Sequence, residues 1–199
     1  MLSEEYGATT VEEYLRLEAQ SQTRHEYVSG EIFAMASCTL RHNVIAGNVA
    51  VTLRVHLRNT PCRPFIGDVK VRLSNPNAYY YPDVFVSCQR DGESMDLEAS
   101  AVDDAVLIVE VLSPGTEAID RREKLVAYRT LPSLAEYALI SQDEARVEIH
   151  RRRGDIGWEK IEYFGDEIVE LASVKLSISI RDIYEGVPIE SLMRGPGQH

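Results

Sequence analysis

Apolar side chains recur along the chain with two different periods. In residues 40–57, Ile45, Val49 and Leu53 follow one another at every fourth position, which is the spacing of one face of a helix. Residues 65–73 instead alternate between apolar and polar side chains, as in a strand with one buried face. The pattern therefore predicts a long helix followed by a half-buried strand.

Other segments extend this mixture of helices and strands. Thr10 and Glu13 have the spacing of a capping box, which predicts a short helix ending near Ala19. Residues 105–112 are almost entirely apolar, as in a central strand that is covered on both faces. The other predicted strands are 24–28, 31–35, 79–88, 135–141, 145–151, 158–164 and 174–180, and the other predicted helices are 117–131 and 181–184. This order predicts a mixed α+β domain with one central sheet and helices packed on it.

Length and composition indicate the domain organisation. The chain has 199 residues, of which 44% are hydrophobic and 27% are charged, as in ordinary globular proteins. A domain holds about 100–200 residues, so we expect one domain over residues 10–185, a flexible N-terminus at 1–9 and a tail at 186–199. We also expect a cytoplasmic protein without a membrane segment, because no run of 18 apolar residues and no signal-peptide pattern occurs.

Charge and cysteine content narrow the possible partners. The net charge is −11, which disfavours general attraction to nucleic acids or acidic membranes, so local geometry or a metal ion must hold any polyanion. Cys38, Cys62 and Cys88 form no pair with metal-ligand spacing. We therefore expect buried, reduced thiols and no zinc site.

Two carboxylates occupy unusual positions in the predicted strands. Asp83 follows Pro82, a proline that indicates an edge strand, a bulge or an irregular entry. Glu110 interrupts the most apolar stretch of the chain. A buried carboxylate is normally paired, protonated or bound to metal. Glu110 alone fits a satisfied core residue, whereas the two residues on neighbouring strands would favour a site for Mg²⁺ or Mn²⁺.

The helix after Glu110 contributes a third candidate group. Asp120, Lys124 and Tyr128 share one helical face because they are spaced by four residues. Lys124 is either the partner of Asp120 in an exposed ion pair or a group that points over the sheet edge toward Glu110. In the second case it would orient an attacking water, help to deprotonate it, or stabilise the charge that develops on phosphorus.

These features resemble a known family. Pro82-Asp83, the apolar strand around Glu110 and the nearby lysine are similar to the PD-(D/E)XK nuclease superfamily. Over residues 10–185 the chain more closely resembles the Uma-type restriction endonuclease family of bacterial proteins. The matching segments are 10–14, 24–32, 41–43, 80–84, 109–114 and 120–124, with Tyr128 following.

The resemblance implies a restriction-endonuclease-like core, a central mixed sheet flanked by helices, with Asp83 and Glu110 as ligands of Mg²⁺. In the superfamily pattern a lysine lies two residues after the acid, but that position is Leu112 in this chain. The resemblance suggests that Lys124 takes its place. It also implies DNA as the partner and a homodimer, since two-fold symmetry supplies the two sites that cut both strands.

Several other residues are weaker candidates, among them Asp120. His42 is a core or cap residue on its helix or, like Glu31, a group that the resemblance allows to reach the active site. Lys70 is a solvated strand charge or a phosphate contact. The run Arg151-Arg152-Arg153 either forms a solvated sheet edge or meets DNA phosphates.

Three functions fit these patterns. The first is a Mg²⁺-dependent DNA endonuclease that uses Asp83, Glu110 and Lys124. The second is a nuclease fold without catalysis that serves as a binding or scaffolding module. The third is a metal-dependent hydrolase of a small phosphoester, which the acidic net charge suits better than DNA.

Overall fold

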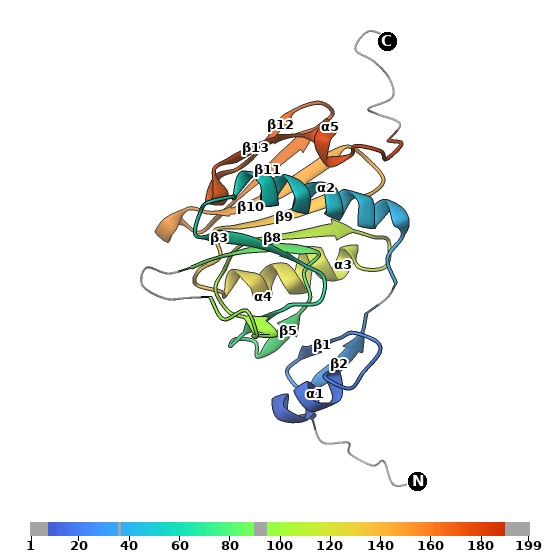
Figure 1. The fold of residues 1–199 in the computed structure, drawn as a ribbon, viewed down its shortest axis with the longest axis vertical. Helices are drawn as coiled ribbons and strands as arrows, with labels where there is room; N and C mark the ends of the chain where they lie inside the picture. Colours follow the sequence, from blue (N-terminus) through green and yellow to red (C-terminus); the bar gives the residue numbers. More distant parts are fainter. Residues whose placement is uncertain (1–7, 36, 90–94, 190–199) are drawn as a thin grey trace.

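A six-stranded mixed sheet forms the centre of the computed structural model, which describes residues 8–35, 37–89 and 95–189 (Figure 1). Its strand order is β11-β10-β9-β8-β6-β3. The strands are β3 (Cys62–Ile66), β6 (Val84–Cys88), β8 (Ala105–Leu112), β9 (Glu136–Ser141), β10 (Arg146–Arg152) and β11 (Trp158–Phe164). β8 and β9 are parallel, and the other neighbouring pairs are antiparallel.

The remaining strands form two further sheets. A five-stranded sheet has the order β2-β1-β5-β4-β7, and β12 pairs with β13. Their bounds are β1 (His25–Val28), β2 (Glu31–Ala34), β4 (Lys70–Leu73), β5 (Ala78–Tyr80), β7 (Ala101–Val102), β12 (Ile168–Leu171) and β13 (Leu176–Ser179). The predicted hairpin of β1 and β2 is confirmed, whereas β12 was not predicted from the sequence.

Two predicted strands are each divided between the two larger sheets. The chain leaves β3 at Gly67, which has a φ of +64°, and then enters β4. It leaves β5 before Pro82 and then enters β6. Neither residue favours the continuation of a regular strand, because glycine is flexible and proline lacks the N–H donor. The expectation of one sheet is therefore incomplete, and Asp83 lies where the chain passes between sheets.

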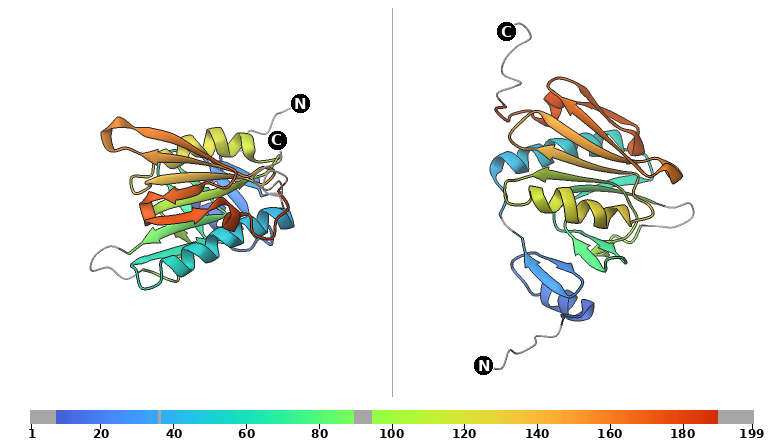
Figure 2. Two further views of the ribbon diagram at one scale, coloured as in Figure 1. Left: turned by 90° about the horizontal axis from the view of Figure 1, so that it is seen from above. Right: turned by 180° about the vertical axis from the view of Figure 1, so that it is seen from behind.

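Helices cover both faces of the six-stranded sheet (Figures 1 and 2). α2 (Leu40–His56) lies on one face, where its predicted stripe of Ile45, Val49 and Leu53 is buried. The other face is covered by α3 (Glu117–Ile119), a π-helical turn (Asp120–Lys124) and α4 (Leu125–Arg129), which together form the predicted helix. The remaining helices are α1 (Val11–Glu18), α5 (Ile180–Ile183) and the 3₁₀ turns Gly154–Ile156 and Ala172–Val174.

The cysteine prediction is wrong in two respects. Cys62 and Cys88 form a disulfide, and Cys38 is exposed. The pairing depends on β3 lying antiparallel to β6 with these two residues directly opposite, which sequence spacing does not reveal. Most of the expected flexible N-terminus and of the expected tail lies outside the described residues. Within the part that the structure describes, no helix is both long and apolar enough to cross a membrane.

Candidate active site

A cavity of about 560 Å³ lies where the β1–β2 hairpin, the first half of α2, the end of β8 and the α3 segment meet. Its walls include the charged or titratable residues Glu26, His42, Asp83, Glu110, Asp120 and Lys124. These residues come from five different elements or connections. Folding therefore assembles the site from distant parts of the chain.

Strand register brings Asp83 and Glu110 together. Val84 of β6 lies opposite Val109 of β8, so the residues beside them, Asp83 and Glu110, are also neighbours. The backbone N–H of Asp83 donates to Glu110 Oε2 at 3.2 Å. The Asp83 carboxylate accepts from the Val111 N–H at 2.7 Å and lies 2.8 Å from His42 Nε2.

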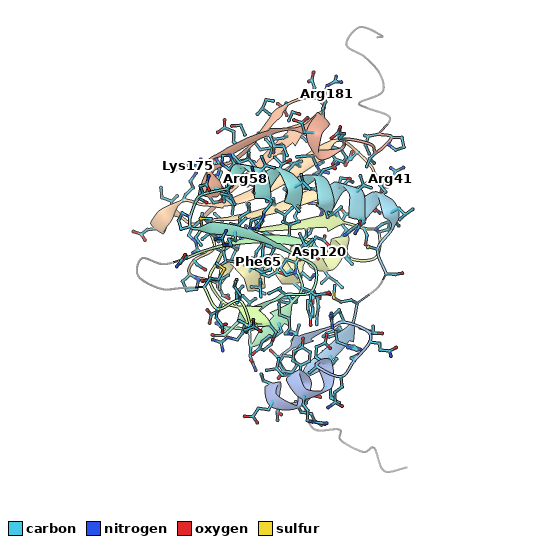
Figure 3. The ribbon with its side chains drawn as sticks, in the orientation of Figure 1. Arg41, Arg58, Phe65, Asp120, Lys175 and Arg181 are labelled. Atoms are coloured by element: carbon cyan, nitrogen blue, oxygen red, sulfur yellow. A yellow bond between two sulfur atoms is a disulfide. The ribbon has the colours of Figure 1, made fainter. Side chains whose placement is uncertain are left out.

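Lys124 points into the site and not into solvent, with only 8% of its side chain exposed. Its Nζ lies 2.9 Å from Glu26 Oε1 and 3.3 Å from both Glu110 Oε1 and Asp120 Oδ1. Tyr128 OH donates to Glu110 Oε1 at 3.2 Å. Figure 3 marks Asp120 on the helical segment under the central sheet. The alternative of an exposed Asp120–Lys124 pair is therefore wrong.

The site holds more carboxyl groups than cationic side chains. Burial raises the pKa of Glu110 well above its usual value; Lys124 opposes this rise, while Asp83, Asp120 and Glu26 add to it. Burial would lower the pKa of Lys124, but the carboxylates of Glu110, Glu26 and Asp120 raise it well above its usual value. Lys124 is therefore a stable ammonium, and it faces more carboxylates than it can neutralise.

The donor atoms suit a hydrated divalent cation. Asp83 and Glu110 supply carboxylate oxygens, and Mg²⁺ usually takes one or two of these and completes its shell with water or phosphate oxygens. His42 Nδ1, from a cavity-lining residue, is buried and has no hydrogen-bond partner within the described part of the chain, and Asp120 Oδ1 is buried with the Lys124 ammonium 3.3 Å away. No group of three or more His, Cys, Asp or Glu side chains is arranged around one point there. Any ion would thus be held by few protein ligands and by water.

Glu31 and Lys70 lie apart from this cavity. Glu31 is an exposed residue of β2 and is not among the described residues that line the cavity. Lys70 is buried and not solvated, with its Nζ 3.4 Å from Tyr81 OH and 5.3 Å from the centre of the ring. Burial lowers its pKa. Lys70 therefore supports Tyr81, whose backbone N–H donates to Glu26 Oε1 at 3.3 Å.

The arginine run 151–153 lies at the other end of the sheet, and its side chains bind their own chain. Arg151 pairs with buried Glu136 at 2.6 Å, and Arg152 donates to the backbone oxygen of Leu134 at 2.8 Å. Arg153 forms an exposed pair with Glu159 at 2.6 Å. The guanidinium groups of Arg151 and Arg152 therefore stabilise the fold through partly buried contacts within the chain.

Sequence reasoning missed Glu26, which makes the shortest of the three contacts to Lys124. It shares the cavity-facing side of β1 with Val28. The signal was the same as for Asp83 and Glu110, namely a carboxylate on the inner face of a predicted strand. Glu26 was overlooked because the sequence of such a short hairpin strand does not show which of its two faces is buried.

Comparisons with known proteins agree with this architecture. The chain belongs to the family described as "Uma2: Putative restriction endonuclease", whose model matches residues 11–181. The resemblance inferred from the sequence is thereby confirmed.

Two relatives come from Synechocystis sp. The uncharacterized protein slr1290 is 34% identical over 177 residues, which are 88% of this chain and 91% of that protein. The uncharacterized protein sll1609 is 32% identical over 168 residues, which are 84% and 94% of the two chains.

A solved structure from Anabaena variabilis, described as "a putative nuclease belonging to DUF820", superposes with a TM-score of 0.71. The match has 18% identity and covers 88% of this chain and 97% of that chain. This likeness confirms the restriction-endonuclease-like α+β fold.

Proposed function

We propose that this protein is a DNA endonuclease that hydrolyses phosphodiester bonds with Mg²⁺ or Mn²⁺. The observation that carries the proposal is the convergence of Asp83, Glu110 and Lys124 on one cavity, in a chain of the restriction endonuclease family. The surplus of buried carboxyl groups supports it, because a cation would offset the cost of ionising these groups beside one another.

Each residue has a distinct task in this proposal. Asp83 and Glu110 hold the cation, which when bound polarises a phosphoryl oxygen and lowers the pKa of water. Lys124 remains charged, so it orients the attacking water and stabilises the negative charge that develops on the phosphate, without acting as a base. Glu26 and Asp120 fix the position of the ammonium, and His42 fixes the Asp83 carboxylate.

Plasmid DNA and single-stranded DNA, incubated with Mg²⁺ or Mn²⁺, test this proposal. Wild type should cut at least one substrate, Asp83→Ala should not, and the matched control Glu31→Ala should cut like wild type because Glu31 is exposed outside the cavity. If neither DNA is cut by wild type, the proposal fails, and the non-catalytic binding or scaffolding module becomes the better account.

One observation favours a small phosphoester as the substrate instead. Among the described residues that line the cavity, Lys124 is the one Lys or Arg side chain, and 5% of the Glu110 side chain is exposed. Such a site gives little attraction to a long polyanion. Hydrolysis of bis(p-nitrophenyl) phosphate by wild type and not by Asp83→Ala, with intact DNA, would favour this second function.

The endonuclease proposal includes a homodimer in the cytoplasm. A two-fold assembly supplies two sites for the two strands of a duplex. Light scattering at micromolar concentration should give about twice the chain mass of 22.4 kDa. A mass equal to one chain would remove the dimer from the proposal.

A further inference from the structure

Positive charge is concentrated in one segment of this acidic protein. Between Glu31 and Asp68 the sequence has four arginines and two histidines but no aspartate or glutamate, although the whole chain has a net charge of −11. This segment contains α2 and β3. The charge is therefore segregated onto two elements that also form part of the cavity wall.

Three of these arginines flank the edge strand β3 on its two sides: Arg54 and Arg58 lie on the side of α2, and Arg63 lies on the opposite face, which it shares with Phe65. Arg54 is in the last turn of α2, Arg58 follows the helix, and Arg63 is on β3, the edge strand that packs against α2. Figure 3 places Arg58 at the end of α2 beside the start of β3. All three residues are exposed. We call Arg54, Arg58 and Arg63 the α2–β3 basic surface.

The guanidinium groups of this surface are not engaged with the protein. Across residues 8–35, 37–89 and 95–189, none of the three forms an ion pair or a side-chain hydrogen bond. Other exposed arginines, such as Arg24 and Arg72, are paired with aspartates. The positive charge of the α2–β3 basic surface is therefore available to an external anion.

The α2 part of the α2–β3 basic surface lies on the same helix as residues of the cavity wall. At about 100° per residue, Asn43, Gly47 and Arg54 fall on one side of α2, and Asn43 and Gly47 line the cavity. A Cβ atom at Gly47 would meet no atom within 4 Å, so this side of the helix is unobstructed at that position. From Gly47 to its last residue, His56, the helix rises by about 14 Å, a length that spans more than one phosphate of a nucleic acid strand.

We propose that the α2–β3 basic surface binds the phosphates of a nucleic acid strand on one side of the bond held in the cavity. The inference rests on the proposed function, because that function supplies the strand. It also resolves the conflict between a net charge of −11 and a polyanionic substrate, since a local cluster of unpaired arginines attracts phosphates at short range in spite of the mean field.

The salt dependence of binding tests this inference. Fluorescence anisotropy would measure the affinity for a labelled single-stranded DNA in EDTA at several salt concentrations, with wild type and the triple variant Arg54→Ala/Arg58→Ala/Arg63→Ala. Each phosphate contact contributes about 0.7 to the slope of log K against log salt for single strands. The triple variant should therefore lower the slope by about 2, and each single variant by about a third of that.

A second triple variant controls for net charge. Arg16→Ala/Arg153→Ala/Arg181→Ala removes the same charge from exposed positions on other elements, and it should leave the slope unchanged. It also tests whether Arg153 contacts DNA. The inference is overturned if wild type does not bind, if the first triple variant keeps the wild-type slope, or if the control loses as much. Competition by polyglutamate as strong as by DNA would also overturn it, because the surface would then favour acidic proteins equally.

This test and the cleavage test fail separately. A protein that binds DNA through the α2–β3 basic surface but cuts no substrate would refute the proposed catalysis and leave the inference standing. A protein that cuts DNA while the triple variant binds and cuts like wild type would refute only the inference.

Discussion

Glu110 on β8 and Glu148 on β10 are buried to the same extent, with 5% of each side chain exposed, yet their surroundings are opposite. Glu110 shares one ammonium with other carboxylates, and its pKa is raised. Glu148 contacts Arg121 at 2.6 Å, His150 at 2.7 Å and Lys160 at 3.1 Å. Burial alone would raise the pKa of Glu148, but these hydrogen bonds lower it to about 2.

The difference separates a structural carboxylate from a candidate catalytic one. Glu148 has its own cations and does not belong to the cavity lining in the described residues. Glu110 lines the cavity and lies in a cluster with too few cations. Burial of a carboxylate is thus a weak sign of function. Unbalanced charge beside an open cavity is a stronger one.

Lys124→Ala should have the largest effect on the Glu110 cluster. Turnover should fall by roughly 10²-fold or more, the scale expected when a positioned charged group is lost from a reacting centre. The rise in melting temperature with Mg²⁺ should survive, because the ligands are elsewhere. Single-turnover cleavage and thermal melts would measure both. Lys124→Arg should restore the charge but not the full rate, since guanidinium differs in shape and reach. Wild-type cleavage by Lys124→Ala would show that Lys124 has no catalytic role.

Asp83→Asn should abolish the metal response of the fold. A cation that binds only the folded state at about 100 times its Kd adds about 2.7 kcal/mol to the free energy of unfolding. Wild type should therefore melt at a higher temperature with Mg²⁺ than with EDTA, and so should the control Glu31→Gln. If Asp83→Asn and Glu110→Gln both retain the wild-type shift, the metal site lies elsewhere.

Glu148→Gln should lower stability but leave the turnover of the folded protein unchanged. Loss of the carboxylate leaves cations without their partner, at a cost of about 1–3 kcal/mol at neutral pH. The folded pKa is depressed to about 2 from 4.5, so this stability is present above pH 4.5 and is lost as the pH falls through about 2. Denaturant melts at several pH values should therefore show the two proteins converging in acid. A difference that stays constant down to pH 2 would contradict the role given to these ion pairs.

Arg153→Ala should have the smallest effect. Its pair with Glu159 is exposed, with 49% and 46% of the two side chains accessible, and such pairs contribute about 0.2–1 kcal/mol. Chemical denaturation would measure the change. A loss comparable to that of Glu148→Gln would mean that exposure does not distinguish the two kinds of ion pair here.

The elements with a clear period were predictable from the sequence. The stripe of Ile45, Val49 and Leu53 gave α2, and the apolar run around Glu110 gave β8. The division of residues 65–73 and 79–88 between two sheets was not predictable, because both halves of each segment are apolar and strand-like. Only the three-dimensional positions of their partners decide which sheet each half joins.

The sequence indicated several of the residues that belong to the site, but not how these residues are arranged in space. Asp83 and Glu110 stood out because carboxylates rarely occur inside apolar strands. The position of Lys124 depended on a π-helical turn that the sequence does not signal. Glu26 and the disulfide of Cys62 with Cys88 depended on pairing between distant strands, which local patterns do not encode.

The passage of the chain between sheets has a further consequence. The backbone oxygen of Asp83 accepts from the N–H of Gly67 at 3.4 Å, so the two crossings are joined to each other beside the cavity. The Asp83 carboxylate is in turn held by His42 and by the Val111 N–H. The side chain therefore loses its rotational freedom when the protein folds and not when a ligand arrives. The entropic cost of ordering the Asp83 carboxylate is therefore incurred during folding, and a cation or a phosphate that enters the cavity does not incur it again on binding.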